Sequence, residues 1–160
     1  MMVMRNRRLL RYGVGIMAMG MVATVAQDLV PSHAVDLPQG GSATRFVLVM
    51  EGVAVTDAMT GLTWEQSPDS FHGVWSESIA HCADKTTGSR KTWRLPTAKE
   101  LASLADRTQR DPALPPEHPF SNVKSAIFWS ATPSETDDIL AWHVSFLSGE
   151  VSTDQKSQTR

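Results

Sequence analysis

The chain has 160 residues, with 15 Lys and Arg against 17 Asp and Glu, and 41% of its residues are apolar. This length suits one domain, and the composition excludes the disordered and collagen-like classes. A formal net charge of −2 argues against a nucleic-acid binder, and a single cysteine excludes an internal disulfide and a CxxC-type zinc site.

The N-terminal part of the sequence has the pattern of a secretory signal peptide. Four arginines precede an uncharged apolar stretch over residues 12–26, and Ser32-His33-Ala34 is a small-x-small cleavage pattern. The gap from Arg11 to Asp28 is shorter than the ~20 residues of a spanning helix, so a signal peptide over 1–34 is favoured over an uncleaved membrane anchor. We expect an exported protein, periplasmic or extracellular, with no stable membrane insertion after cleavage. The general and twin-arginine export routes both remain open.

The first part of the exported chain reads as a leader followed by strands. Residues 35–45 contain a proline and two glycines and predict a flexible leader. Strands are expected at 46–50, 53–55 and 62–65, with a turn from Asp57 to Gly61.

Two short helices are predicted next. Trp75, Ile79 and Cys82 recur at helical spacing, with Ser76 as the expected N-cap. In the second helix, Thr97 and Glu100 have the spacing of a capping box, and the apolar pattern extends to about residue 106.

The last third of the chain predicts a long loop and then strands. Residues 107–125 contain four prolines, and loops of this length tend to be functional or mobile. Strands are expected at 127–131 and 140–146; in the second, alternation places Trp142 inward and His143 outward. The order of elements predicts an α+β domain, with two short helices against a small antiparallel sheet and a long loop.

No catalytic or metal-binding pattern is evident. The four histidines after residue 34 lack the spacing of zinc ligands, and the sequence has no nucleophile elbow, phosphate-binding loop or dinucleotide-binding motif. We therefore expect no enzyme, no metal and no cofactor.

A few residues are candidates for ligand binding. Most of the five tryptophans are expected in the core, with Trp129 or Trp75 as a possible stacking surface. Arg90 and Lys91 belong to a basic cluster over 90–94 that is either a solvated turn or an anion-binding patch, and His118 lies in the long loop. Structural roles are expected for Arg94, paired with Glu100, and for Thr97 and Cys82.

Four ordered segments resemble a known family. They are 55–64 (VTDAMTGLTW), 93–101 (WRLPTAKEL), 128–132 (FWSAT) and 141–149 (AWHVSFLSG). Together they resemble the Lcl C-terminal domain family, exported bacterial domains named for a collagen-like adhesin, over about residues 53–152.

The resemblance implies a C-type-lectin-like α+β fold and adhesin-like recognition of a glycan or surface protein at the cell envelope; the namesake adhesin binds glycosaminoglycans. The WRLPT segment is also similar to formylglycine-generating-enzyme-like domains. An accessory or degenerate enzyme module of that kind is the alternative. Those relatives use several cysteines and a metal ion, and a chain with one cysteine cannot reproduce that site. The calcium-binding triplets of lectins are missing as well.

The family also bears on Cys82. A helix cysteine at this place is matched in the family by a cysteine in a final strand, and this sequence ends about where that strand should begin. Cys82 is then either an inert buried side chain or the remaining half of a lost disulfide. We favour the second interpretation, in which residues 46–160 form the family domain without its last strand. Pairing of Cys82 between chains stays open, as does the oligomeric state.

Overall fold

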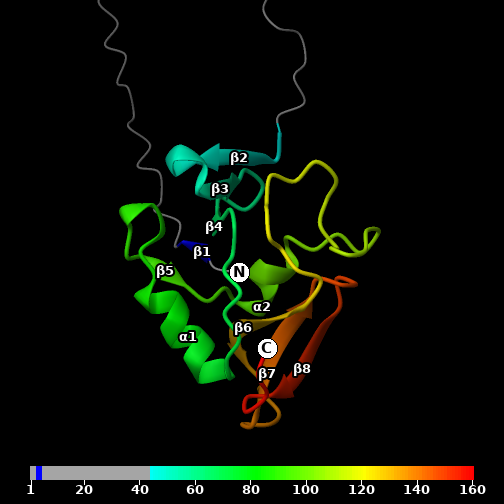
Figure 1. The fold of residues 1–160 in the computed structure, drawn as a ribbon. Helices are drawn as coiled ribbons and strands as arrows, with labels where there is room; N and C mark the ends of the chain where they lie inside the picture. Colours follow the sequence, from blue (N-terminus) through cyan, green and yellow to red (C-terminus); the bar gives the residue numbers. More distant parts are fainter. Residues whose placement is uncertain (1–2, 5–43) are drawn as a thin grey trace, which may run out of the picture. The chain divides into compact units, whose positions relative to one another are not determined.

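The computed structural model describes residues 3–4 and 44–160. In this part of the chain the fold is mixed, with two antiparallel sheets and two short α-helices (Figure 1). The predicted signal peptide over 1–34 and leader over 35–45 lie outside the described residues, except for Val3, Met4 and residues 44–45. Within the described residues, no helix has the length and apolar character needed to cross a membrane.

The first sheet has five strands in the order β2-β3-β4-β1-β5. Each strand is antiparallel to its neighbours, and the two-residue β1 pairs with β4 on one side and with β5 on the other. Val3 and Met4 thus lie inside this sheet, between β4 and the edge strand β5. The strands are β1 (Val3–Met4), β2 (Phe46–Val49), β3 (Ala54–Asp57), β4 (Thr63–Glu65) and β5 (Trp93–Arg94).

The second sheet has three strands in sequence order, β6 (Ile127–Pro133), β7 (Leu140–Ser145) and β8 (Val151–Gln155). Helix α1 (Trp75–Asp84) runs beside β5 and packs also on β6, whereas α2 (Ala98–Ala102) packs on β6 and β7 (Figure 1). Two 3₁₀ turns complete the elements, η1 (Met50–Gly52) and η2 (Thr87–Ser89). The predicted strands and both predicted helices are present, with boundaries shifted by one to four residues.

The turn between β3 and β4 forms as its sequence predicts. The amide of Gly61 donates to the carbonyl of Asp57 at 2.7 Å, and Gly61 has φ 68°, a conformation that glycine adopts without strain. The Asp57 side chain is fully buried and accepts hydrogen bonds from Arg45 at 2.9 and 3.1 Å. This ion pair joins the start of β2 to the end of β3.

The caps of the two helices differ from each other. In α2 the capping box is confirmed, because Thr97 Oγ1 accepts from the amide of Glu100 and the Glu100 carboxylate accepts from the amide of Thr97. The prediction that α2 reaches residue 106 is wrong; the chain tightens into turns after Ala102. Ser76 is not the N-cap of α1. Val74 holds that position, and its amide donates to Glu77 Oε2 at 3.1 Å.

The buried side chains form two clusters. The first lies around Trp64, Leu101 and Phe146, and the second joins Trp93, Trp129 and Cys82 between α1, β5 and the second sheet. Strand β7 contributes to both clusters, so both of its faces are covered. For this reason the prediction that His143 points outward is wrong, and its side chain is only 7% exposed.

The segment between α2 and β6 is a long loop, as predicted, but it is anchored to the rest of the domain. Its residues Ala113, Leu114 and Phe120 are buried, and the last two belong to the first cluster. The amide of Ala113 donates to the carbonyl of Phe146 at 2.6 Å, and the amide of Ser121 donates to the carbonyl of Gln66. The loop therefore closes one side of the core and leads into the wall of the site described next.

Candidate functional site

A cavity lies between helix α1, the segment that follows β4 and the chain that enters β6. Residues 69–72 form its exposed rim, the side of α1 that carries Ser78 and Cys82 forms one wall, and residues 122–129 form another. Arg160 adds to the lining from the end of the chain. The site thus depends on segments up to 95 residues apart in sequence.

The cavity is small and mostly apolar inside. Its volume is about 70 Å³, and a water molecule needs roughly 10–15 Å³, so it has room for about five waters. Leu95, Phe128 and Trp129 line it with apolar side chains. Polar side chains line it at the rim and also at wall positions such as Ser78, Asn122 and Arg160, a composition typical of small-molecule sites.

A network of paired charges borders the rim. Lys85 of α1 contacts Glu65 at 2.9 Å and Asp69 at 2.8 Å, and His81 contacts Asp69 at 2.9 Å. Burial alone would raise the pKa of Asp69, but hydrogen bonds from Lys85 and His81 outweigh burial and hold it below its usual value. Burial likewise acts to lower the pKa of Lys85, and its two carboxylate partners outweigh that effect. The Asp69 carboxylate is therefore ionised at neutral pH.

An aromatic pair lies over the rim. The rings of Phe71 and His81 are stacked, with centroids 4.0 Å apart and an interplanar angle of 7°. Gly73 leaves room for this arrangement, since a Cβ at that position would lie 2.6 Å from the Phe71 ring. Phe71 is partly exposed, which gives the rim an apolar face beside the Asp69 carboxylate.

Two N–H donors in the cavity lining have no acceptor among the described residues. The indole Nε1 of Trp129 is buried without a hydrogen-bond partner, and only 3% of that residue is exposed. The Nε of Arg160 is also buried and unpaired, whereas another nitrogen of the same guanidinium contacts Asp154. Buried polar groups are nearly always paired in folded proteins. Neither nitrogen has surface that a water-sized atom could touch, and Trp64, His118 and His143 outside the lining also carry unpaired buried nitrogens, so the unpaired groups do not by themselves mark a binding site.

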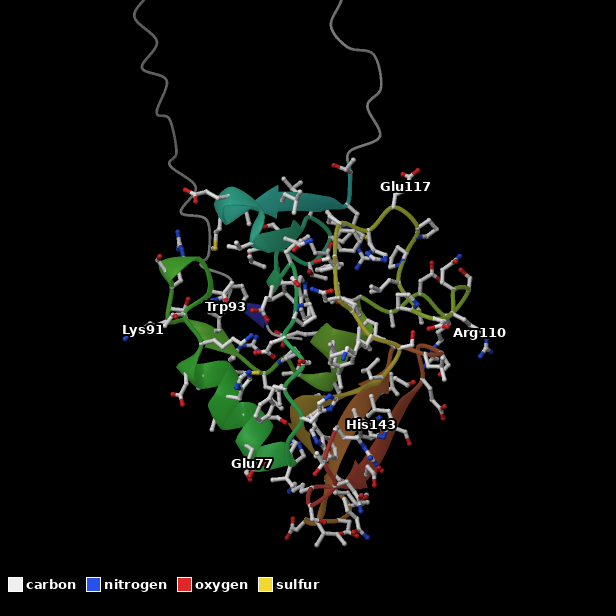
Figure 2. The ribbon with its side chains drawn as sticks, in the orientation of Figure 1. Glu77, Lys91, Trp93, Arg110, Glu117 and His143 are labelled. Atoms are coloured by element: carbon white, nitrogen blue, oxygen red, sulfur yellow. The ribbon has the colours of Figure 1, made fainter. Side chains whose placement is uncertain are left out.

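The four predicted ligand-binding residues do not come together in one site. Arg90 and Lys91 are exposed between η2 and β5, and Lys91 extends away from the domain (Figure 2). His118 is half-buried in the long loop beside Phe120, with its pKa lowered by burial. Trp129 alone lines the cavity. Because it is buried, its ring is not the exposed stacking surface that the sequence suggested; it forms wall instead.

The residues predicted to be structural have the expected surroundings. Arg94 contacts the Glu100 carboxylate through two nitrogens at 2.6 and 2.8 Å, which confirms the predicted pair. The hydrogen bonds from Arg94 hold the pKa of Glu100 below its usual value. Cys82 is a free thiol in the second cluster, on the predicted stripe with Trp75 and Ile79.

The nucleophilic side chains near the cavity are poorly suited to catalysis. Burial raises the pKa of the Cys82 thiol to about 11, so the reactive thiolate is scarce at neutral pH. Ser130 is fully buried, and its hydroxyl donates to the carbonyl of Trp142 at 2.7 Å. Among the described residues, no cluster of three or more His, Cys, Asp or Glu side chains is arranged to hold a metal ion.

Most of the cavity was missed by sequence reasoning. Asp69, Phe71 and Arg160 carry no local signal, because a short loop and a chain end give no periodic pattern. One signal was present in α1, where Ser78, His81 and Lys85 follow each other at helical spacing beside the apolar stripe. A polar stripe next to an apolar one indicates a helix whose side borders a wet surface.

The model of the Lcl C-terminal domain family matches residues 53–160. The match covers more than half of the chain, which therefore belongs to this family, as its four ordered motifs indicated. No curated protein and no solved structure matches the chain.

Proposed function

We propose that this member of the Lcl C-terminal domain family is an exported recognition domain that binds a glycan at the cell envelope, with the cavity behind residues 69–72 as its binding site. Adhesin-like binding is the biological setting that fits such a domain. A C-type-lectin-like architecture is part of the same proposal. It is supported by family membership and by the two small antiparallel sheets, two helices and long loop.

One observation carries the proposal: a single cavity combines apolar walls at Leu95, Phe128 and Trp129 with a polar rim at residues 69–72. Such a combination is typical of sites that bind small molecules. The rim adds an apolar ring at Phe71 and a carboxylate at Asp69. Apolar faces combined with hydroxyl and carbonyl oxygens are what sugar residues present, and this rim complements both.

The alternative is an accessory or degenerate enzyme module. Against it stand the high pKa of Cys82 and the hydrogen bond that occupies the Ser130 hydroxyl. Turnover of a glycoside or ester that disappears in a Ser130→Ala variant would favour the enzyme.

The binding proposal is tested with a cavity-filling variant. Ala126 is half-buried and lines the cavity, and the three carbon atoms added by Ala126→Leu would occupy much of its volume. Ala80→Leu adds the same atoms to an exposed position of α1 and serves as the control. On a glycan array we expect binding by the wild type and by Ala80→Leu, and at least ten-fold weaker binding by Ala126→Leu. Equal glycan binding by the wild type and both variants would refute the proposed site. A wild-type chain that binds protein ligands but no glycan would refute the proposed ligand.

A further inference from the structure

The place of β1 in the first sheet points to a second interaction surface, the slot between β4 and β5. Val3 and Met4 pair in antiparallel fashion with β4 on one side and with β5 on the other, and Figure 1 shows β1 between these strands. Both residues belong to the predicted signal peptide over 1–34. We propose that the exported chain, once this peptide is removed, binds an extended segment of another polypeptide in the slot. This inference rests on the export proposed above and is independent of glycan binding.

The walls of the slot are held in place by contacts that do not involve β1. Strand β4 pairs with β3 along its other edge, and α1 packs on β5. Glu65 at the end of β4 accepts hydrogen bonds from Lys85 at 2.9 and 3.0 Å and from the Thr87 hydroxyl at 2.9 Å. The carbonyl of Thr87 in turn accepts from Nε1 of Trp93 in β5 at 3.0 Å. These contacts link β4 to β5 through η2, so both strands keep their places when β1 leaves.

Direct pairing of β4 with β5 is a poor way to close the slot. Hydrogen-bonded strands lie about 4.8 Å apart, so two strands with a third between them are separated by roughly 10 Å. Closure therefore needs a movement of about 5 Å, which breaks the link through Thr87. An empty slot leaves backbone groups without partners beside Trp64 and Trp93, which are 0% and 3% exposed. Because buried backbone groups are nearly always paired, the slot favours an occupant with two free backbone edges, which is an extended strand.

The register defines which residues the slot accepts. Residues directly opposite each other in antiparallel strands have their side chains on the same face of the sheet. One position of the slot lies opposite Trp64 and the next lies opposite Trp93, and these tryptophans belong to different buried clusters. Both faces of the slot are thus covered, which is typical of strands with continuous apolar sequences. Arg94, opposite the first position, is already paired with Glu100. We expect the partner to offer two adjacent apolar residues, because a charge at either position would be buried without a partner.

The test uses the full chain and a fluorescein-labelled peptide with the sequence of residues 1–6, MMVMRN. In the wild type, β1 competes for the slot from within the same chain, so we expect the free peptide to bind weakly. The double variant Val3→Asp/Met4→Asp disfavours β1, because β1 would then bury two carboxylates. By fluorescence anisotropy we expect this variant to bind the peptide at least ten-fold more tightly than the wild type.

Two controls separate strand addition from adhesion to another surface. Val47→Asp/Leu48→Asp places the same charges on exposed apolar positions of β2 and should bind the peptide as weakly as the wild type. A peptide with Val3→Pro and Met4→Pro lacks two backbone N–H groups and should not bind the charged β1 variant. Equal affinity of this variant and the wild type for the MMVMRN peptide, or equal binding of the two peptides, would overturn the proposal.

Hydrogen exchange of one amide reports directly on the slot. The amide of Asp57 in β3 donates to the carbonyl of Leu62, and successive residues along a strand point their backbone groups to opposite sides, so the amide of Thr63 points into the slot. We expect it to exchange at least ten-fold faster in the charged β1 variant than in the wild type, and the peptide to restore slow exchange. Slow exchange in the variant without peptide would show that another part of the chain fills the slot. That result, or fast exchange that the peptide leaves unchanged, would overturn the proposal.

A milder variant decides the question if Val3→Asp/Met4→Asp does not fold. Val3→Gly/Met4→Gly weakens β1 without adding charge, and we expect it to bind the peptide about three-fold more tightly than the wild type. If this variant also fails to fold, β1 is a permanent part of the core, and the proposal that the slot opens on export is overturned. The glycan array with the wild-type chain reads out glycan binding separately from each of these results.

Discussion

The buried ion pair between Asp57 and Arg45 gives a direct test of what stabilises the first sheet. The Asp57 carboxylate is fully buried and accepts four hydrogen bonds, two from Arg45, one from the amide of Met59 and one from the Thr60 hydroxyl. Asp57→Asn removes the charge and turns part of this acceptor into a donor. Arg45 also donates to the carbonyl of Ser103 at 2.6 Å, which holds its side chain in place. In the variant, the Arg45 charge would therefore stay where it is without a carboxylate partner.

The expected magnitude follows from burial. Removing one partner of a fully buried pair costs about 3–5 kcal/mol, but the Arg45 side chain is 25% exposed and is partly hydrated when left alone. We therefore expect Asp57→Asn to lower the free energy of unfolding by about 2–3 kcal/mol and the melting temperature by about 10 °C. Urea denaturation followed by tryptophan fluorescence measures the change, with Asp138→Asn at an exposed position as the control.

Acid provides a second readout of the same ion pair. Burial would raise the pKa of Asp57, but the hydrogen bonds, those of Arg45 first, outweigh burial and lower it from 3.8. The stabilisation by this group is thus fully present above pH 4 and is lost as the pH falls through the lower folded value. The difference in the free energy of unfolding between wild type and Asp57→Asn should therefore become smaller in that pH range. A difference below about 0.5 kcal/mol at pH 7, or a difference that stays the same in acid, would refute the stabilising role of the Asp57–Arg45 ion pair.

Three further predictions concern other parts of the domain. Thr97→Ala should lower the free energy of unfolding by about 1 kcal/mol through loss of the α2 cap, and Thr92→Ala, at an exposed position, should leave it unchanged in the same urea titration. With a pKa of about 11, Cys82 should be alkylated by iodoacetamide at pH 8 at least ten-fold more slowly in the folded chain than in urea; equal rates would contradict its burial. Burial, with the charge of Arg160, lowers the pKa of His143, so its contribution to stability is present above pH 6.5 and is lost as the pH falls through the folded value. His143→Gln should make the melting temperature less dependent on pH between pH 7 and 5, and a pH dependence identical to that of wild type would refute this prediction.

Features that depend on neighbours in sequence were predicted correctly. The capping box of Thr97 and Glu100, the pair of Arg94 with Glu100 and the turn closed by Gly61 each involve residues no more than six positions apart. In such cases backbone geometry alone brings the groups into contact. The same holds for the apolar stripe of α1, which packs as its spacing indicates.

The wrong predictions have a common physical cause in tertiary packing. Alternation along β7 indicates two faces but not which of them is covered, and α1, β5 and Trp129 cover the face that carries His143. At the start of α1, a serine was the expected cap because serine hydroxyls accept from helix amides. The helix begins two residues earlier, at Trp75, whose amide donates to the carbonyl of Lys156 near the end of the chain. No local pattern contains that contact.

The cavity shows what kind of information a sequence lacks. Trp129 reads as a core residue, and burial confirms this, yet the same side chain also forms part of the wall of the cavity. Whether a buried side chain borders a cavity depends on every segment that surrounds it, here the rim at 69–72, α1 and the end of the chain. A cavity with apolar walls and a polar rim is a stronger indication of a binding site than the exposed basic residues Arg90 and Lys91, whose charge the solvent already satisfies.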